Sequence, residues 1–298
     1  MMSAGMRESE FLSQIRLATR PDPRVPIHIG DDLAALQFES TDLVLVGIDQ
    51  VLDRVHFDLR QHTLEQVARK AVLRNISDCA AMACVPVACV ASLALPASSP
   101  PLDPRVIFDA MTQVASQFDC VIVGGDTGSW AGPLAISVAI IGGSRGVTPV
   151  RRSGAKPGDK LFVTGPLGGS ILGRHLNFTP RITLARELAR HFDIHAMLDL
   201  SDGLSQDLPR ICDMSGVGAT IDAAAVPIHD DVSKLNSARS PLDHALHDGE
   251  DYELLFAAPS CDDPRVTCIG TVDQHLGVRI TIDGITVPLL PRGWDHAF

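Results

Sequence analysis

Apolar and polar positions change period repeatedly along the first half of the chain, and this change predicts strands interleaved with helices. Residues 63–75 and 103–118 place apolar side chains every three or four positions, as amphipathic helices do. Thr63 and Asp103 stand where the N-caps of these two helices are expected. Short apolar runs between the helices have the length of strands: 43–48, 86–96, 120–126 and 134–143.

A change of composition near the middle divides the chain into two predicted domains. Residues 142–159 are rich in Gly, Pro, Arg and Ser and have no apolar periodicity. We therefore expect one domain at 1–145 and a second at 146–298. The second half again mixes strand-like runs with a helical pattern at 182–192. The pattern as a whole favours a protein of two domains that each contain both helices and strands.

Charge and hydropathy exclude several classes of protein. The net charge is −11 and no run of Lys and Arg occurs, so nucleic acid is not an expected partner. The longest apolar stretch, 83–97, is interrupted by Pro86 and is shorter than the ~20 residues of a membrane helix. The first residues contain no apolar signal-peptide core. A cytoplasmic protein is therefore expected.

The acidic residues are biased in type and in position. There are 29 Asp but only 7 Glu, and Asp suits tight turns and sites for hard metal ions. Clustered carboxylates repel one another unless cations lie between them, and Mg²⁺ commonly bridges carboxylates to substrate phosphates. Each segment alone is typical of a turn or a helix cap, but together they predict a magnesium site. Acids beside Gly or Ser follow apolar runs or open helices in six segments: 29–32, 47–49, 75–78, 123–126, 199–203 and 248–251.

Other phosphate-binding signatures are weak or missing. The chain has no G-x-x-x-x-G-K-[ST] loop and only four Lys. The Gly-rich segment 165–173 lacks the spacing of a dinucleotide site. It is expected to form either a phosphate-binding turn or a simple helix entry.

Seven motifs follow one another along the chain: IGDD (29–32), D-x6-HF (49–57), N-x-SD-x-AAM (75–82), GGDT (124–127), RSGAKPGD (152–159), D-x-SDGL (199–204) and GEDYELLF (249–256). In this order they resemble the thiamine-monophosphate kinase family. The resemblance covers nearly the whole chain and extends to the terminal GWDHAF. It implies an architecture like that of aminoimidazole ribonucleotide synthetase, with two α+β domains and ATP between them. In that architecture the N-terminal sheets of two copies join into a barrel across a homodimer.

The resemblance implies that ATP phosphorylates thiamine monophosphate to thiamine diphosphate by direct in-line transfer. Because the attacking group is already an anionic phosphate oxygen, no strong general base is needed. Several Mg²⁺ ions held by Asp would neutralise the two polyanions and align them.

The same resemblance assigns roles to individual residues. Catalysis is expected from Asp32, Asp49, Asp78, Asp126 and Asp202. Metal ligands are expected at Asp32, Gly47, Ile48, Asp49, Asp78, Asp126, Asp199 and Asp202. ATP is expected to contact Gly125, Asp126, Arg152 and Ser201. Thiamine monophosphate is expected to contact His56, Glu250 and Trp294, with stacking on the indole.

Four departures from the family pattern leave an alternative open. The residues around Asp49 lack the family's usual hydroxyls, since Gly47, Ile48 and Gln50 occupy those places. Arg54 and Asp248 replace the usual Gly residues, and the stretch 170–181 is short. These changes suggest a degenerate paralogue that binds nucleotide or thiamine phosphate without turnover. A further alternative is another ATP-dependent enzyme of the superfamily, although a selenophosphate synthetase would need a Cys that the first 78 residues lack.

Overall fold

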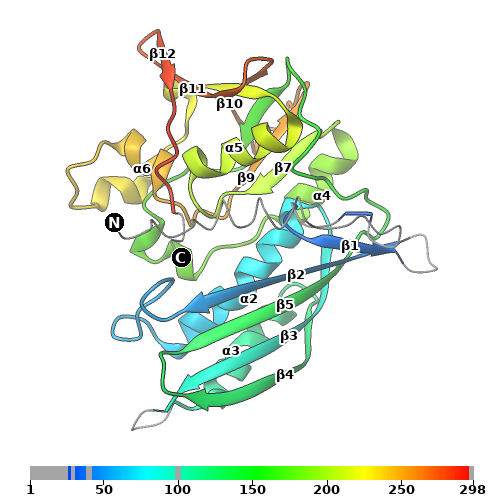
Figure 1. Ribbon diagram of the computed structural model, residues 1–298, viewed down its shortest axis with the longest axis vertical. Coiled ribbons are helices and arrows are strands. Elements are labelled where there is room, and N and C mark those ends of the chain that lie inside the picture. Colours follow the sequence, from blue (N-terminus) through cyan, green and yellow to red (C-terminus); the bar gives the residue numbers. More distant parts are fainter. Residues whose placement is uncertain (1–25, 28–30, 38–41, 98–101, 295–298) are drawn as a thin grey trace, which may run out of the picture.

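The computed structural model describes residues 26–27, 31–37, 42–97 and 102–294. Each half of the chain forms one sheet with helices, and the two halves lie one above the other in Figure 1. This arrangement confirms the expected α+β fold with two sheets. The domain boundary at 145/146 falls in the loop between the last strand of the first sheet and the first strand of the second.

The first half is a mixed five-stranded sheet with helices on one face. Its strand order is β1-β2-β5-β3-β4, in which β3 and β4 are parallel and the other pairs antiparallel. Helices α2 (Leu64–Ala81) and α3 (Pro104–Ser116) lie behind this sheet in Figure 1. The strands are β1 (Ala34–Gln37), β2 (Leu43–Leu52), β3 (Val85–Pro96), β4 (Val121–Trp130) and β5 (Ala135–Gly143).

Helix α2 begins where the sequence predicts and ends six residues later than predicted. Thr63 and Gln66 form a reciprocal capping box, which satisfies two backbone N–H groups at the start of the helix. The predicted end at 75 is wrong because the buried segment 76–81 continues the helix. Ala80 and Ala81 pack into a core shared with the second half, so α2 joins the two halves.

The second half is a seven-stranded sheet of order β12-β11-β8-β10-β6-β9-β7. Helix α4 (Ile182–His191) matches the predicted helix at 182–192. Two further helices are α5 (Leu204–Ser215) and α6 (Pro241–His247). The strands are β6 (Lys160–Val163), β7 (Ala196–Asp199), β8 (Gly218–Asp222), β9 (Leu254–Ala258), β10 (Thr267–Asp273), β11 (Gly277–Ile282) and β12 (Ile285–Pro288).

The face of the first sheet opposite α2 and α3 is not covered by any described helix (Figure 1). Ile48 on β2 is 71% exposed there, and Val90 on β3 is 39% exposed. The sheet of one chain is open, and β4 forms an edge with no described neighbour beyond it. The barrel expected across a homodimer therefore stays a prediction.

No helix among the described residues is long and apolar enough to cross a membrane.

Candidate functional site

Three carboxylates from distant parts of the chain meet where the two halves join. Asp32 precedes β1, Asp78 lies on α2 and Asp199 ends β7. Oxygen atoms of the three side chains all lie within 4.8 Å of one another. Ser77 on α2 donates a hydrogen bond of 2.5 Å to Asp199. We call Asp32, Asp78 and Asp199 the acid cluster, and it ties the helix of the first half to the sheet of the second.

Arg152 is the cation nearest to this cluster. Its guanidinium donates two hydrogen bonds to Asp32, from Nε at 2.9 Å and from Nη2 at 2.7 Å. Its backbone N–H donates to Asp31 at 2.6 Å. The two parallel bonds fix the plane of the guanidinium. Contact of Arg152 with a nucleotide phosphate, which the sequence suggests, stays a prediction.

Burial and mutual repulsion disfavour the charged forms of the acid cluster. Burial raises the pKa of Asp78 well above its usual range, and the carboxylate of Asp199 raises it further. Burial also raises the pKa of Asp199, with Asp32 as the next cause. A divalent cation between these oxygens would remove both penalties, because it compensates the charges that repel.

Asp49 lies on β2 with its side chain toward α2. Its carboxylate forms an ion pair of 2.6 Å with Arg74. Ile48 points to the opposite, exposed face of the sheet. A Cβ on Gly47 would lie 2.2 Å from Leu33 Cδ2, so the usual family hydroxyl at that place would require Leu33 to move.

Two of the predicted substrate residues are joined by a buried lysine. Lys70 on α2 is fully buried, and its Nζ lies 2.5 Å from Glu250 Oε1. The same Nζ donates to the backbone oxygen of His56 at 2.6 Å. Nδ1 of His56 accepts a hydrogen bond from the backbone N–H of Leu52 at 3.1 Å, which fixes the ring. One ammonium group therefore positions both His56 and Glu250.

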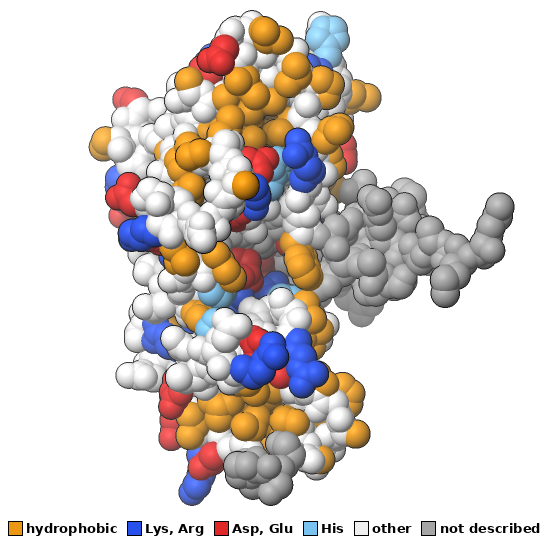
Figure 2. Space-filling view, turned by 90° about the vertical axis from the view of Figure 1, so that its left-hand side faces the viewer, with side chains coloured by type: hydrophobic (Ala, Val, Ile, Leu, Met, Phe, Trp, Pro, Cys, Tyr) orange, Lys and Arg blue, Asp and Glu red, His pale blue; other side chains and the backbone are white. Residues whose placement is uncertain are grey.

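The third predicted substrate residue approaches from the end of the chain. The backbone N–H of Trp294 donates to the oxygen of Asp202 at 3.0 Å, and its indole is half exposed. The backbone N–H of Glu250 donates to the oxygen of Ser201 at 2.7 Å. The segment that follows β7 thus holds both. In Figure 2 acidic, basic and His side chains gather in the hollow between the two halves.

Asp202 does not join the acid cluster among the described residues. Its carboxylate pairs with Arg210 on α5 at 2.5 Å, and its N–H is taken by Asp207 at 2.9 Å. The guanidinium occupies one carboxylate oxygen of Asp202, and the predicted metal role of this residue stays a prediction.

Asp126 lies three strands away from Asp49 within one chain. The strand register aligns Gln50, Ser137, Ser92 and Asp126 in one row across β2, β5, β3 and β4. The adjacent row contains Asp49 and ends at Gly125 on β4. Three strand spacings, roughly 14 Å in total, separate β2 from β4. Asp126 also faces the uncovered side of the sheet, whereas Asp49 faces the helices.

The positions of several acids differ from the sequence pattern. Asp49, Asp78 and Asp126 were expected in loops that leave strands or at the start of helices. Asp49 and Asp126 lie within strands β2 and β4, and Asp78 lies near the end of α2. The Gly and Ser neighbours of these acids misled the prediction, because the same residues serve here as close-packed positions.

The Gly-rich segment 165–173 begins a short 3-10 turn rather than an α-helix. The backbone N–H of Gly168 donates to Asp251 at 2.9 Å and that of Gly169 to Asp248 at 3.0 Å. Carboxylates of the chain therefore occupy the amides that a phosphate would use.

Lys70, Arg74 and Ser77 were missed from the sequence although they hold predicted site residues. Lys70, Arg74 and Asp78 are spaced by four and four, so they form one polar stripe along a helix that is largely buried from residue 67 onward. That spacing is the signal that would have revealed Lys70 and Arg74.

Comparison with known proteins places this architecture in a class. Residues 30–143 match the AIR synthase related protein, N-terminal domain, and residues 143–260 match the corresponding C-terminal domain. A thiamine-monophosphate kinase of Rhodopirellula baltica is 39% identical over 258 residues, which cover 84% of this chain and 81% of that protein. The Escherichia coli K12 enzyme of that name is 32% identical over 311 residues, covering 91% and 92%. The chain belongs to the thiamine-monophosphate kinase family and is therefore an enzyme.

Solved structures agree with this assignment. A structure described as AaThiL complexed with AMPPCP and TMP has a TM-score of 0.84 and 28% identity, and covers 97% of each chain. A thiamine-monophosphate kinase from Stenotrophomonas maltophilia has a TM-score of 0.72 and 32% identity, covering 94% of this chain and 98% of that one. The hydrogenase maturation protein HypE in complex with ATP, at 19% identity and a TM-score of 0.65, shares the fold.

Proposed function

We propose that the protein transfers the γ-phosphoryl group of ATP to the phosphate of thiamine monophosphate. The observation that carries this proposal is the acid cluster, which lies beside the residues predicted to bind substrate and in a chain of this family. An all-carboxylate site suits a reaction between two polyanions, because transfer then depends on charge neutralisation and alignment rather than on a base.

The acid cluster fits magnesium. Its donors are hard carboxylate oxygens within 4.8 Å of one another, which is the chemistry that Mg²⁺ prefers. Asp32, Asp78 and Asp199 would hold the ion, and the bound ion would neutralise the phosphate oxygens. Arg152 orients Asp32, and Ser77 orients Asp199.

The thiamine end of the substrate is assigned to His56, Glu250 and Trp294. Glu250 is held by Lys70 and keeps one carboxylate oxygen for a donor such as an aminopyrimidine. Trp294 offers a half-exposed aromatic face for stacking. ATP is assigned to the cleft between the halves, with Ser201 and Arg152 on its walls.

A homodimer completes this site. Strand β1 pairs only with positions 43–46 of β2, so the edge at 47–52 has no described neighbour, and neither has the outer edge of β4. Joining these edges between two copies would close the sheets and cover the apolar face that exposes Ile48 and Val90. It would also bring β4 of the partner, the strand that carries Asp126, next to the edge of β2 that carries Asp49, whereas β4 of the same chain lies three strands away. This geometry supports a site that both copies build.

The test is a transfer assay with purified protein, ATP, Mg²⁺ and thiamine monophosphate, with thiamine diphosphate quantified by chromatography. Product should form with thiamine monophosphate and not with unphosphorylated thiamine. Nucleotide binding without any product would favour the degenerate paralogue instead. ATP consumption that does not depend on thiamine monophosphate would contradict both readings.

A further inference from the structure

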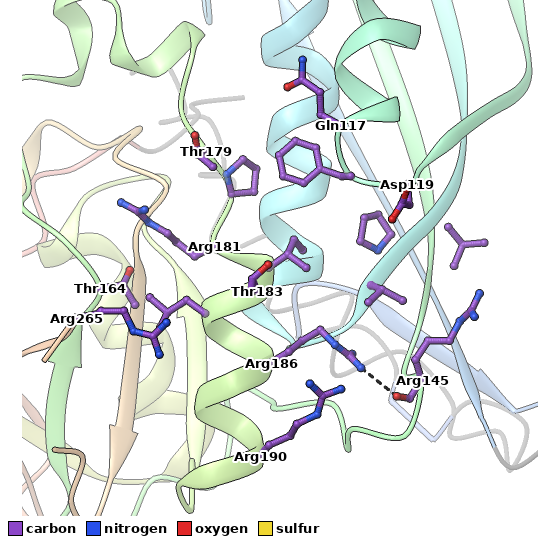
Figure 3. Close-up of a pocket in the computed structure, with 17 residues that line it drawn as sticks. Gln117, Asp119, Arg145, Thr164, Thr179, Arg181, Thr183, Arg186, Arg190 and Arg265 are labelled. Atoms are coloured by element: carbon purple, nitrogen blue, oxygen red, sulfur yellow. Dashed lines mark hydrogen bonds between the residues drawn. The ribbon is translucent and has the colours of Figure 1, made fainter. Parts of the chain in front are cut away.

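A second pocket lies between the two halves, lined by residues outside the proposed active site. Its volume is about 940 Å³, and the start of β3, the end of α3 and the first turns of α4 form its walls (Figure 3). This volume is within the range of pockets that hold small organic ligands. None of its lining residues belongs to the acid cluster or to the residues predicted for ATP and thiamine monophosphate.

The charge of this pocket is opposite to that of the whole protein. Asp119 is the one acidic residue among the seventeen that line it. The chain as a whole carries a net charge of −11, so such a concentration of cations needs a cause. Five of the lining residues are arginines: Arg145, Arg181, Arg186, Arg190 and Arg265.

Two of the five arginines are neutralised by carboxylates of the chain. Arg181 donates two hydrogen bonds to Glu253, at 2.8 and 2.5 Å. Arg265 pairs with Asp263 and Glu187, each at 2.6 Å. These ion pairs leave Arg181 and Arg265 with structural roles.

The other three arginines have no carboxylate partner among the described residues. Arg186 is 7% exposed, and its guanidinium donates only to backbone oxygens, those of Ala83 at 2.8 Å, Ser144 at 3.1 Å and Arg145 at 3.0 Å. Burial lowers the pKa of Arg186, and the charge of Arg190 lowers it further. A buried cation that faces two more cations is costly unless an anion compensates it.

The backbone holds these three groups on one side of the pocket. Arg186 and Arg190 are one helical turn apart on α4, and both extend toward the side of Arg145 in Figure 3. Arg145 has a left-handed backbone with φ 45°, a conformation that is uncommon for a residue other than Gly. An anion bound here would therefore meet side chains from both halves of the chain.

Apolar side chains also line the pocket, together with uncharged Thr and Gln side chains. The apolar residues include Val85, Pro86, Phe118, Ile182 and Leu184. A ligand that fills both sides needs an anionic end and an apolar or aromatic end. Phosphate groups suit the anionic end, because the planar guanidinium donates two parallel hydrogen bonds to such oxygens.

We propose that this pocket binds a small molecule in which two or more phosphate groups are attached to an apolar or aromatic group. Three guanidiniums that have no carboxylate partner among the described residues, against the one carboxylate of Asp119, leave a local charge that a diphosphate balances. The ligand bridges Arg145 of the first half and Arg190 of the second. Binding there stabilises the arrangement of the two halves and is independent of the proposed transfer reaction.

Isothermal titration calorimetry with ADP, and separately with inorganic diphosphate, tests this proposal. Both titrations are done with excess chelator, because without a cation the acid cluster repels phosphates. The wild-type protein should bind both probes, with ADP the tighter one. The variant R145Q/R190Q should bind each probe about 10-fold more weakly or worse.

The matched control is R60Q/R105Q, which removes two exposed arginines that pair with Asp58 and Asp103 outside the pocket. It should bind both probes like the wild type, and circular dichroism should show that both variants are folded. Equal binding by R145Q/R190Q and the wild type would overturn the proposal. Absence of binding of either probe at millimolar concentration would overturn it as well. If inorganic diphosphate bound as tightly as ADP, the proposal that the ligand carries an apolar or aromatic group would be wrong.

Discussion

At the scale of single residues, the chemistry of the site depends on charges that the fold holds together against their repulsion. Asp78 and Asp199 have raised pKa values because both are buried and each lies near another carboxylate, Asp199 for Asp78 and Asp32 for Asp199. The sequence predicted that acids would meet, and Asp32, Asp78 and Asp199 do so. It did not predict Lys70, since a buried lysine is recognisable only from its partners, and these lie far away in the sequence.

Replacing Asp78 by Asn should separate function from stability. We expect transfer to fall by about 100-fold or more, because a charged group that holds the reacting phosphates through a metal is lost. The melting temperature of the metal-free protein should not decrease, since one of the repelling charges is removed. Transfer assays and calorimetry in chelator measure both effects. D262N, at an exposed acid, is the control, and unchanged turnover of D78N at saturating Mg²⁺ would contradict the assignment.

Replacing Lys70 by Met should weaken the binding of thiamine monophosphate more than the binding of ATP. The change removes the ammonium that holds both Glu250 and the backbone of His56. We expect the KM for thiamine monophosphate to rise about 10-fold, because a factor of this size corresponds to the loss of one charged hydrogen bond. The KM for ATP should change little. Steady-state kinetics with each substrate varied gives both constants. An equal rise in both constants would instead indicate a general structural role for Lys70.

At the scale of elements, α2 organises the site. It carries Lys70, Arg74 and Asp78 on one stripe and packs against both sheets. Its start was predictable because Thr63 and Gln66 are local signals, whereas its end was not. Residues 75–78 contain Asn, Ser and Asp, which are weak helix formers, and tertiary burial overrides that preference. The strand order was not predictable either, because β5 lies between β2 and β3 in the first sheet although it follows both of them in the sequence.

Removing the cap of α2 should lower stability without changing the chemistry. Thr63→Ala deletes the side chain that accepts from the Gln66 N–H. We expect the free energy of unfolding to fall by about 1 kcal/mol. Denaturant unfolding gives this value, and Thr63→Ser, which keeps the hydroxyl, should stay near the wild type. The transfer rate at 25 °C should remain within about two-fold of the wild-type rate, since a change of this size leaves the protein folded. A much larger loss of activity would show that the cap contributes to the geometry of the active site.

At the scale of the whole molecule, the first sheet has an uncovered apolar face and two edges with no described neighbouring strand. A protein that functions as a monomer would be expected to cover or protect both features. The family resemblance predicted a dimer. No pattern in the sequence, however, indicated that Asp126 and Asp49 lie on opposite faces of one sheet. That relation follows from the register of four strands. Under the proposed function, the site is then complete only when a second copy supplies Asp126.

A charge placed on the uncovered face should therefore abolish both assembly and transfer. Ile48→Arg puts a cation at a position that is 71% exposed in one chain and would be buried in the dimer. Sedimentation equilibrium should give a dimer for the wild type and a monomer for the variant. Ile285→Arg on β12, at a position that is 68% exposed, should leave assembly and transfer unchanged. A monomeric wild type with full activity would contradict the shared site.

The separation of Asp126 from Asp49 across the sheet of one chain has a genetic consequence. If each site takes Asp78 from one copy and Asp126 from the other, the alleles D78N and D126N are each inactive but complement each other. In a cell that carries both, random pairing leaves about one quarter of the sites with both acids, because half of the pairs are mixed and each mixed pair has one intact site. Growth that depends on thiamine diphosphate would then be rescued by two defective genes, whereas neither gene supports it alone.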